Sequence, residues 1–548
     1  MKNLSKIFTI VATVIFMTGI ATSCKKDVKL LNITLDNTTA TVSVGETKQL
    51  NVIINPLDAS NKDITWRSGK PSVAMVDNGI VTGVSLGNAT ITAIAKADTT
   101  LKSTCEVTIV PSNGQVITVS GEINTNTTWY SNARYLLNGF VYVANNATLT
   151  IQPGTIIKGI YGSKGALIIE RGAKIMAAGT SSQPIIFTSD RPAGQRAAGD
   201  WGGLVICGKA TTNKHDSGTG VGQAEGGIRS LYGGTDDTDN SGILQYVRIE
   251  FPGIALTSSS NSEINGLTIY SVGTGTTIDH IQVSYSGDDS YEWFGGTVNC
   301  KYLVALRGLD DEYDTDNGFR GKVQFALGIR DPQVADQSGS NGFESDNDAE
   351  GDQLTPVTAP VFSNVTLFGP YAVSASTPNS NFKRVMHLRR STQLSVYNSI
   401  FVGWPKGLII DGALGNAPAM AQNNTLQIEK CILAGMITNF EEAPATSGTP
   451  PVAANMLFSV ADQQTWFDLA SRSNDRTKTV ADILGANLLS LTSPSLLPSA
   501  GAIFLTGASF TNSKLTNSFF TSVTYLGAFG TTNWTSGWCN FDPQNAGY

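Results

Sequence analysis

The sequence predicts an all-β protein in which an N-terminal β-sandwich is followed by a right-handed parallel β-helix with an irregular C-terminal cap. Three observations carry this prediction. The 548 residues are too many for a single small domain. Charged residues make up only 15% while glycine reaches 56, a composition typical of extracytoplasmic β-rich proteins. A sequence pattern also returns after a fixed interval of 22 residues, as in solenoids. The alternative is a β-propeller, but its blades need about 40 residues.

The first residues have the features of a secretory signal. Lys2 and Lys6 precede an apolar run over residues 7–20, which ends in Ala21-Thr22-Ser23-Cys24. This ending resembles a bacterial lipoprotein signal, which implies a leader over residues 1–24 and lipidation of Cys24. An ordinary signal peptide cut near Ser23 is the alternative.

The resemblance implies an outer-membrane lipoprotein, held by membrane lipid and expected on the cell surface. The periplasmic face stays open as the second location. Other outer-membrane uptake components are further candidate partners. Beyond the leader, no stretch reaches the roughly 18 apolar residues that a membrane span requires.

Residues 25–111 alternate between short apolar-polar strands and turns, which predicts a β-sandwich. The segment resembles the group 2 bacterial Ig-like family. The resemblance is carried by Val44-Gly45-Glu46, Trp66-Arg67-Ser68, the stretch 73–83, and Gly87-Asn88-Ala89-Thr90. Members of that family serve as spacers or adhesive modules, so we interpret this domain as a stalk with Trp66 in its core.

Residues 112–448 contain short strands rich in β-branched residues that recur every 18 to 24 positions. Leu149 and Leu167 are 18 apart, whereas Ile281, Leu303 and Phe325 are 22 apart. Coils of this length predict a parallel β-helix. The acidic coils resemble β-helix proteins of secreted bacterial lipoproteins, an architecture shared with pectate lyases.

The β-helix period fades over residues 449–548. Short helices are predicted at 462–470 and 479–488, followed by an irregular aromatic end. Because a solenoid leaves its last coil unpaired, we expect this region to cap it.

An acidic pattern repeats within the predicted β-helix. The 22-residue step places Asp288 over Asp310 and Glu292 over Asp314, one strand spacing of about 4.8 Å apart. Carboxylates this close repel unless a cation lies between them, and hard oxygen donors suit calcium. The predicted calcium ligands are Asp288, Asp289, Glu292, Asp310, Asp311, Asp314 and Asp316. The alternative is a solvated acidic corner neutralised by Arg307, Arg320 and Arg330.

Charge is concentrated in the same region. Residues 279–352 carry a formal charge of −11, whereas the whole chain carries −7. An acidic surface of this kind excludes nucleic acid as a partner and favours cations or polar ligands. A second acidic patch at 344–348 is a weaker candidate site.

Aromatic residues interleave with the acids, as sugar-stacking side chains would. The predicted ligand-binding residues are Trp293, Tyr291, Tyr313 and Arg320, with Trp293 expected to be partly exposed. The sequence therefore favours an anchored protein whose β-helix binds glycan or another polymer in surface binding or adhesion. No catalytic residue is assigned.

Two enzymatic alternatives and one structural alternative remain at this stage. A calcium-dependent polysaccharide lyase would need a base, which Lys383, Arg384, Arg389 or Arg390 around His387 could supply. However, nothing in the sequence places them over the acids.

A glycoside hydrolase could instead use Asp289 and Asp311 near the separation of about 5–5.5 Å found in retaining enzymes. The third alternative is a purely structural surface protein.

Overall fold

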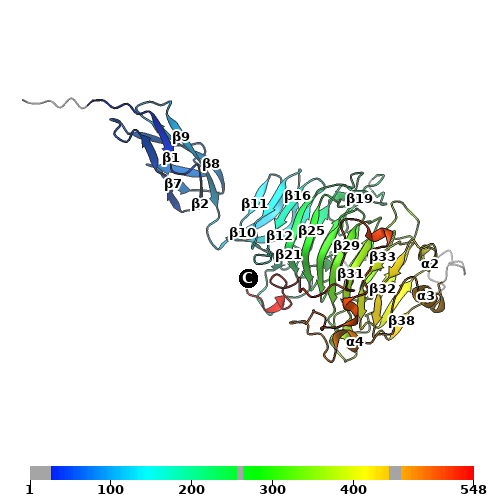
Figure 1. Ribbon diagram of the computed structural model, residues 1–548. Coiled ribbons are helices and arrows are strands. Elements are labelled where there is room, and N and C mark those ends of the chain that lie inside the picture. Colours follow the sequence, from blue (N-terminus) through cyan, green and yellow to red (C-terminus); the bar gives the residue numbers. More distant parts are fainter. Residues whose placement is uncertain (1–25, 217, 256–262, 443–457) are drawn as a thin grey trace, which may run out of the picture. The chain divides into compact units, whose positions relative to one another are not determined.

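The computed structural model describes residues 26–216, 218–255, 263–442 and 458–548 (Figure 1). The chain divides into two compact units, residues 1–112 and 113–548. The predicted leader with Cys24 lies outside the described residues, as does the predicted boundary at 448. Within the described part of the chain, no helix is long and apolar enough to cross a membrane.

The first unit is a sandwich of short strands with its own core. Val107 and Ile109 are completely buried there, and Trp66 packs against the same cluster. A two-residue turn, Asn78-Gly79, joins β6 to β7 with positive φ at both positions, as tight hairpins require. The strands are β1 (Asn32–Leu35), β2 (Thr39–Ser43), β3 (Thr47–Gln49), β4 (Val52–Asn55), β5 (Ile64–Ser68), β6 (Ala74–Asp77), β7 (Ile80–Gly83), β8 (Gly87–Ala95) and β9 (Lys102–Val110).

The second unit is a parallel β-helix in which each coil contributes strands to three faces, confirming the predicted fold class. Strands that bend around a corner belong to two faces. Face A contains β10 (Gln115–Ile123), β12 (Ala133–Val143), β14 (Ile156–Gly159), β17 (Ile185–Ser189), β21 (Gly242–Glu250), β25 (Thr277–Ser284), β27 (Cys300–Leu306), β29 (Lys322–Ile329), β31 (Val361–Phe368), β34 (Ile400–Val402) and β37 (Ile432–Ala434).

Face B follows face A along each coil. It contains the ends of β10 and β12, then β15 (Ala166–Ile169), β18 (Gly203–Cys207), β24 (Leu267–Tyr270), β26 (Tyr291–Phe294), β28 (Tyr313–Asp316), β30 (Phe343–Ser345), β32 (Arg384–Leu388), β35 (Lys406–Ile410) and β38 (Thr438–Phe440). Face C contains β11 (Thr127–Trp129), β13 (Thr148–Ile151), β16 (Lys174–Ala178), the starts of β21, β25, β27, β29 and β31, then β33 (Ser395–Tyr397) and β36 (Gln427–Glu429).

The register confirms one part of the 22-residue step and corrects another. Glu292 pairs with Asp314 as predicted. Leu303, however, pairs with Ala326 rather than with Phe325. This coil has one residue more than the step predicts, and Phe325 occupies the corner between faces C and A.

That corner has a ladder of its own. One residue per coil takes a positive φ between 49° and 62°, in the series Tyr246, His280, Tyr302, Phe325, Asn364, Asn398 and Lys430. The rings of Tyr246, His280 and Tyr302 stack with successive centroid distances of 4.3 Å. The left-handed conformation turns the chain from one face to the next, so neighbouring coils stack even where their lengths differ.

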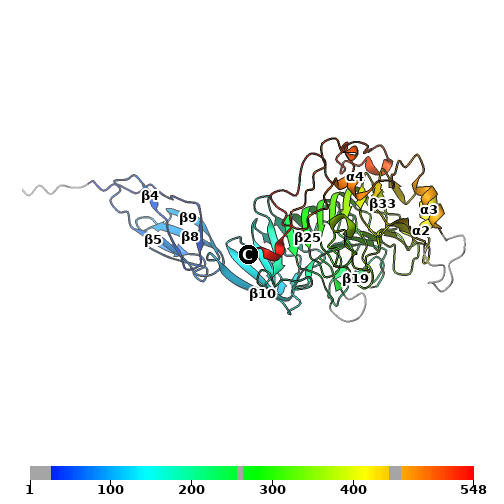
Figure 2. The same cartoon turned by 90° about the horizontal axis from the view of Figure 1, so that it is seen from below.

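The C-terminal region does more than cap the last coil. Helix α3 (Val460–Phe467) does close the end, since Trp466 and Phe467 join the β-helix core. Helix α4 (Val480–Leu484) then begins a segment, residues 480–548, that returns along face A towards the first coils and that we call the C-terminal strap (Figures 1 and 2). Three shorter helices lie in this segment: η2 (Ile503–Leu505), η3 (Ser513–Leu515) and η4 (Pro543–Asn545).

The strap is held by side chains of the coils it crosses. The Asn398 amide exchanges two hydrogen bonds with the backbone of Ser509, Gln324 does so with Thr521, and Gln282 with Asn540. The outward side chains of face A are apolar here, which explains the covering. Leu306, Ile329, Phe368 and Val402 are buried against strap residues that include Phe529 and Trp538.

Face B has a different cover. The hairpins β19–β20 (Gly222–Gln223, Leu231–Tyr232) and β22–β23 (Ile254–Ala255, Glu263–Ile264) contribute Tyr232 and Ile264 to a cluster over its earlier coils. Both ribbon views place β19 and α4 on opposite sides of the β-helix. Beyond Phe294, the outward residues of face B become acidic.

Two further helices, α1 (Pro370–Val373) and α2 (Ala417–Gln422), lie between strands of later coils.

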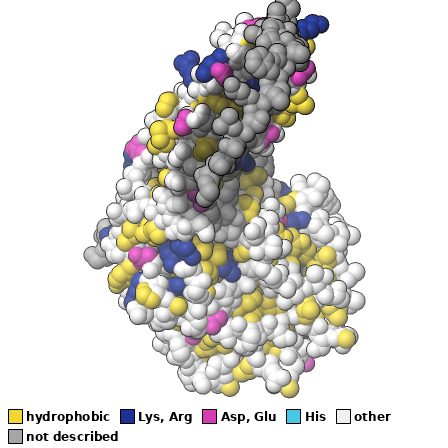
Figure 3. All heavy atoms as spheres, turned by 90° about the vertical axis from the view of Figure 1, so that its left-hand side faces the viewer, with side chains coloured by type: hydrophobic (Ala, Val, Ile, Leu, Met, Phe, Trp, Pro, Cys, Tyr) yellow, Lys and Arg dark blue, Asp and Glu magenta, His cyan; other side chains and the backbone are white. Residues whose placement is uncertain are grey.

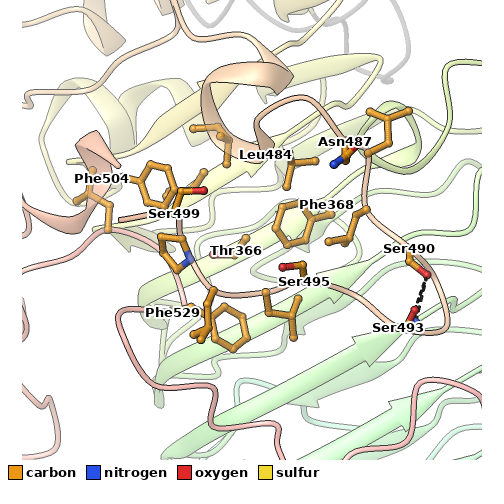
Figure 4. Close-up of a pocket in the computed structure, with 18 residues that line it drawn as sticks. Thr366, Phe368, Leu484, Asn487, Ser490, Ser493, Ser495, Ser499, Phe504 and Phe529 are labelled. Carbon is orange, nitrogen blue, oxygen red and sulfur yellow. Dashed lines mark hydrogen bonds between the residues drawn. The ribbon is translucent and has the colours of Figure 1, made fainter. Parts of the chain in front are cut away.

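A cavity of about 350 Å³ lies between the strap and face A. Phe368, Phe504 and Phe529 line it together with Ser495 and Ser499 (Figure 4). None of the acidic residues predicted as calcium ligands lines this cavity. The space-filling view in Figure 3 shows a face on which uncharged surface predominates and Lys and Arg side chains gather in one area.

Trp538→Ala is expected to destabilise the β-helix unit by about 3–5 kcal/mol, the usual cost of removing a buried tryptophan. The Trp538 side chain is 1% exposed, lies edge-on to Tyr246 and His280, and donates a hydrogen bond to the Trp534 carbonyl. Calorimetry should show a lower unfolding temperature for this unit and an unchanged transition for the sandwich. Ile503→Ala, at a strap residue that is 57% exposed, is the control and should change stability by less than about 0.5 kcal/mol.

Candidate functional site

An outward ladder of polar side chains runs along face B. Parallel register places Thr268, Glu292, Asp314, Glu344 and His387 one above another on consecutive coils. Because side chains alternate along a strand, all five leave the same side of the sheet. The neighbouring residues of the same strands point into the core instead.

The aromatic residues predicted to bind sugar are in that core, so this prediction is wrong. Tyr291, Trp293 and Tyr313 each have 0% exposed surface. The Tyr313 hydroxyl donates to the Leu327 carbonyl at 3.0 Å, and Trp293 stacks on Phe319 with centroids 5.4 Å apart. The physical reason is strand alternation, which turns these rings inward when Glu292 and Asp314 turn outward.

Arg320, the fourth predicted ligand residue, is hydrogen-bonded within the protein. Its guanidinium donates to the Asp237 carboxylate at 2.9 Å, to the Thr211 hydroxyl at 2.7 Å and to the Gly318 carbonyl at 3.1 Å. These bonds fasten the 209–237 loop to the acidic coil. Gly318 itself has a φ of 87°, and an added Cβ would meet the Pro356 carbonyl oxygen at 2.5 Å, so a side chain there would be strained.

Asp289 and Asp311 clamp consecutive coils together. They are only 8% and 4% exposed. The Asp289 carboxylate accepts the backbone N–H of Asp311 at 2.8 Å, and the Asp311 carboxylate accepts that of Asn341. Their burial and these hydrogen bonds argue against Asp289 and Asp311 as the catalytic pair of a glycoside hydrolase, because a substrate could not reach both carboxylates.

The arginines expected to neutralise the acids are paired elsewhere. Arg307 pairs with Asp331, and Arg330 pairs with Glu312 at 2.8 Å with both side chains completely buried. Within the described residues, no ion pair involves any of the seven predicted calcium ligands. The three arginines therefore do not neutralise these acids, as the alternative of a solvated acidic corner required.

Five of the seven carboxylates lie close enough to share metal ions. One oxygen each of Asp288, Asp289 and Asp310 lie within 4.8 Å of one another, and so do one oxygen each of Asp289, Glu292 and Asp314. Burial raises the pKa of Asp310 and of Asp316 to about 8, and neighbouring carboxylates act in the same direction. Burial and nearby acids also raise the pKa of Glu292 and Asp314.

Several buried oxygens around these acids lack a hydrogen-bond partner. Asn265 is 2% exposed and Thr268 is 1% exposed, yet Asn265 Oδ1 and Thr268 Oγ1 have no partner, and neither does Asp314 Oδ1. The Asn265 amide nitrogen donates to Glu292, and Thr268 pairs in register with Glu292. Buried polar atoms of this kind are normally satisfied by water or an ion, so the donor set fits a cation.

On the next coil of face B, the acidic side chains form ion pairs with basic ones. Glu344 and Asp346 pair with Arg389, and Arg390 pairs with Asp346 at 2.7 Å. Although burial opposes it, Arg389 and His387 lower the pKa of Glu344 to about 2. The basic cluster is thus one coil from Glu344 and two coils from Asp314, closer than the sequence separation indicated.

His387 lies between two carboxylates. Its Nδ1 is 3.3 Å from Glu344 and its Nε2 is 3.1 Å from Asp411, while Arg384 approaches Nδ1 at 3.2 Å. Burial opposes protonation, but the hydrogen bonds to Asp411 and Glu344 raise the pKa of His387 above its ordinary value. The two carboxylates therefore favour the protonated form of the imidazole, which links them.

Sequence reasoning missed some members of this site. Asn265 and Thr268 come from the coil before the acidic repeat, outside the 22-residue pattern. The sequence pattern indicates a separate acidic patch at 344–348, but this segment is the third coil of the ladder. Its sequence Glu344-Ser345-Asp346-Asn347 follows the pattern of Asp314-Thr315-Asp316-Asn317. A longer loop makes this interval 30 rather than 22 residues, which hid the match.

The fold and site define an all-β protein with an acidic stripe on one β-helix face, where the oxygen donors fit a cation. The chain belongs to the family of pectate-lyase-like beta helix domains, whose family model matches residues 121–475. The bacterial Ig-like domain (group 2) model matches residues 30–107, which confirms the resemblance in the first unit.

Curated relatives match only parts of the chain. An uncharacterized protein of Clostridium acetobutylicum is 29% identical over 179 residues, which are 30% of this chain and 18% of that protein. A 3-O-alpha-D-galactosyl-alpha-L-arabinofuranosidase of Bifidobacterium longum subsp. longum is 39% identical over 77 residues, 14% of this chain and 7% of that enzyme. The chain spans less than a fifth of either relative.

The stabilising contribution of His387 is expected to be present at low pH and lost at high pH. Because its pKa is raised in the folded state, its contribution is complete below the ordinary value of about 6.5 and disappears as pH rises through the folded-state pKa. His387→Gln should therefore lower the unfolding temperature more at about pH 5.5 than at about pH 9, by an amount worth about 1.5–3 kcal/mol.

His215→Gln is the matched control for this measurement, because His215 is exposed and lies outside the ladder. A destabilisation by His387→Gln that does not change with pH would contradict the raised pKa of this imidazole.

Proposed function

We propose that the acidic stripe on face B holds calcium and binds a glycan chain, in a protein anchored at the cell surface. The observation that carries this proposal is a set of seven carboxylates on consecutive coils, five of them close enough to share metal ions, with no ion pair to a cationic side chain among the described residues. Calcium takes six to eight oxygen ligands in irregular geometry, and open positions on such an ion can be filled by sugar oxygens or carboxylates.

The position of the stripe supports a binding role. Face A is covered by the strap, whereas Glu292, Asp314, Asp316 and Glu344 on face B keep part of their surface exposed. The ladder extends over at least three coils, which offers a polymer several successive contacts. Membership of the pectate-lyase-like family supports a glycan as the polymer, but a shared fold alone carries no activity.

A calcium-dependent lyase is the second candidate. It is favoured by one observation, the position of Arg389 and Arg390 one coil beyond Glu344 and two coils beyond Asp314. Both guanidiniums are engaged by Asp346, and a lyase base must be free to accept a proton, so binding without cleavage is the better supported function.

The location rests on the leader sequence. Lipidation of Cys24 would tether the sandwich and the β-helix to the outer membrane, with the sandwich as stalk. Cells producing the full chain should retain it in the membrane fraction and release most of it when Cys24 is replaced by serine. Equal membrane retention of Cys24→Ser would contradict the lipid anchor.

Calcium-dependent glycan binding can be measured with the soluble chain starting at Lys25. We expect calcium at about 100 times its Kd to add about 2.7 kcal/mol to the unfolding free energy, since it binds only the folded state. Retention on immobilised arabinan, galactan and polygalacturonate should then be compared with calcium and with excess chelator. Asp314→Asn should weaken calcium-dependent retention at least tenfold.

Asp352→Asn is the control, because Asp352 is exposed and outside the stripe. Retention that survives the chelator would contradict a calcium-mediated contact, and newly formed unsaturated ends on a retained glycan would favour the lyase. Absence of any calcium-induced stabilisation would contradict the metal site itself.

A further inference from the structure

The two groups of carboxylates that could hold a cation have one member in common. Asp288, Asp289 and Asp310 form the first group, at the turns that precede β26 and β28. Asp289, Glu292 and Asp314 form the second group, of which the last two residues are on the strands themselves. Asp289 therefore lies between two positions, each with three carboxylate ligands.

We propose that face B holds two calcium ions side by side, with the Asp289 carboxylate bridging them. This inference rests on the calcium part of the proposed function and adds the number of ions and the ligands of each. The first ion is bound by Asp288, Asp289 and Asp310 in the turns. The second is bound by Asp289, Glu292 and Asp314 on the open face.

Charge favours two ions over one. The two groups comprise five carboxylates, and none of the five has an ion-pair partner among the described residues. When all five are ionised, one calcium ion would leave three negative charges uncompensated in partly buried positions. Two ions reduce this to one. Asp311 and Asp316 lie outside both groups, and each accepts a hydrogen bond from a backbone N–H group.

The oxygens without partners mark the second position independently of the acids. Asn265 and Thr268 are almost completely buried, and both contact or pair with Glu292 rather than with the first group. Their free oxygens, together with Asp314 Oδ1, are neutral and anionic donors next to the second group. Calcium accepts amide, hydroxyl and carboxylate oxygens together, so these atoms complete a coordination shell that carboxylates alone would leave short.

The arrangement also indicates how a ligand would bind. The second ion is at the surface of the ladder, where Glu292 and Asp314 remain partly exposed. An anionic group with two oxygens can bridge a pair of divalent ions, which are typically about 3.5–4 Å apart. The ligand would thus be a polymer that bears anionic substituents, with the ion pair binding one substituent directly.

Calcium stoichiometry tests the proposal directly. The chelator-treated soluble chain should bind two calcium ions by isothermal titration calorimetry. Glu292→Gln and Asp310→Asn should each bind one, because each removes a ligand of a different ion, and Asp289→Asn should weaken both by at least tenfold. Asp352→Asn is the matched control and should still bind two.

Manganese provides a second readout that does not depend on affinity. With two Mn²⁺ ions bound, electron paramagnetic resonance should show the spin coupling of a pair about 3.5–4 Å apart, and Glu292→Gln should give the spectrum of an isolated ion. Circular dichroism of each variant establishes that the fold is retained. Addition of galacturonate, inorganic phosphate or sulfate should perturb the coupled spectrum if that anion bridges the ions.

The possible results are distinguishable. One calcium ion in the unaltered chain, or uncoupled manganese, would overturn the pair while leaving the proposed function intact. Loss of the same single ion from Glu292→Gln and Asp310→Asn would also overturn it. No bound ion at all would contradict the calcium part of the proposed function as well.

Discussion

Parallel, in-register stacking of coils is the constraint on which the structure depends. It places corresponding positions of successive coils about 4.8 Å apart, so any side-chain type that repeats along the chain becomes a continuous ladder. Apolar ladders form the core, and rings stack at the corner that begins with Tyr246, His280 and Tyr302. The same rule applied to Glu292 and Asp314 creates a ladder of like charges, which is unfavourable without a compensating ion.

Faces A and B of the β-helix differ in what covers their outward side chains. Face A has apolar outward residues, and the chain covers them with its own C-terminal strap, which is held by paired amide bonds from Gln282, Gln324 and Asn398. Face B is covered by short hairpins over its earlier coils and turns acidic where that cover ends. The apolar surface of face A is thus buried within the protein, whereas the acidic part of face B stays polar and partly exposed.

Much of the fold could be predicted from the sequence, and so could the general location of the site. The interval between Asp288 and Asp310 gave the coil length, and the β-branched strands gave the architecture. The inward or outward direction of each strand residue was harder to predict. Because side chains alternate along a strand, Tyr291 and Glu292 must point to opposite sides of the sheet. The local sequence does not determine which of the two points into the core. Burial of Trp293 follows only once its strand is placed against the core.

By itself, the sequence determined the two-unit all-β organisation, the vertical pairing of Glu292 with Asp314, and the acidic character of one stretch. These follow from composition and from a constant interval, which are properties of the chain alone. Only the tertiary structure decided that Arg389 and Arg390 lie next to Glu344 and Asp346, that Asn265 and Thr268 lie beside Glu292, and that the final residues return along face A. In a solenoid, loops of different length separate neighbouring coils, so distance along the chain does not report distance in space.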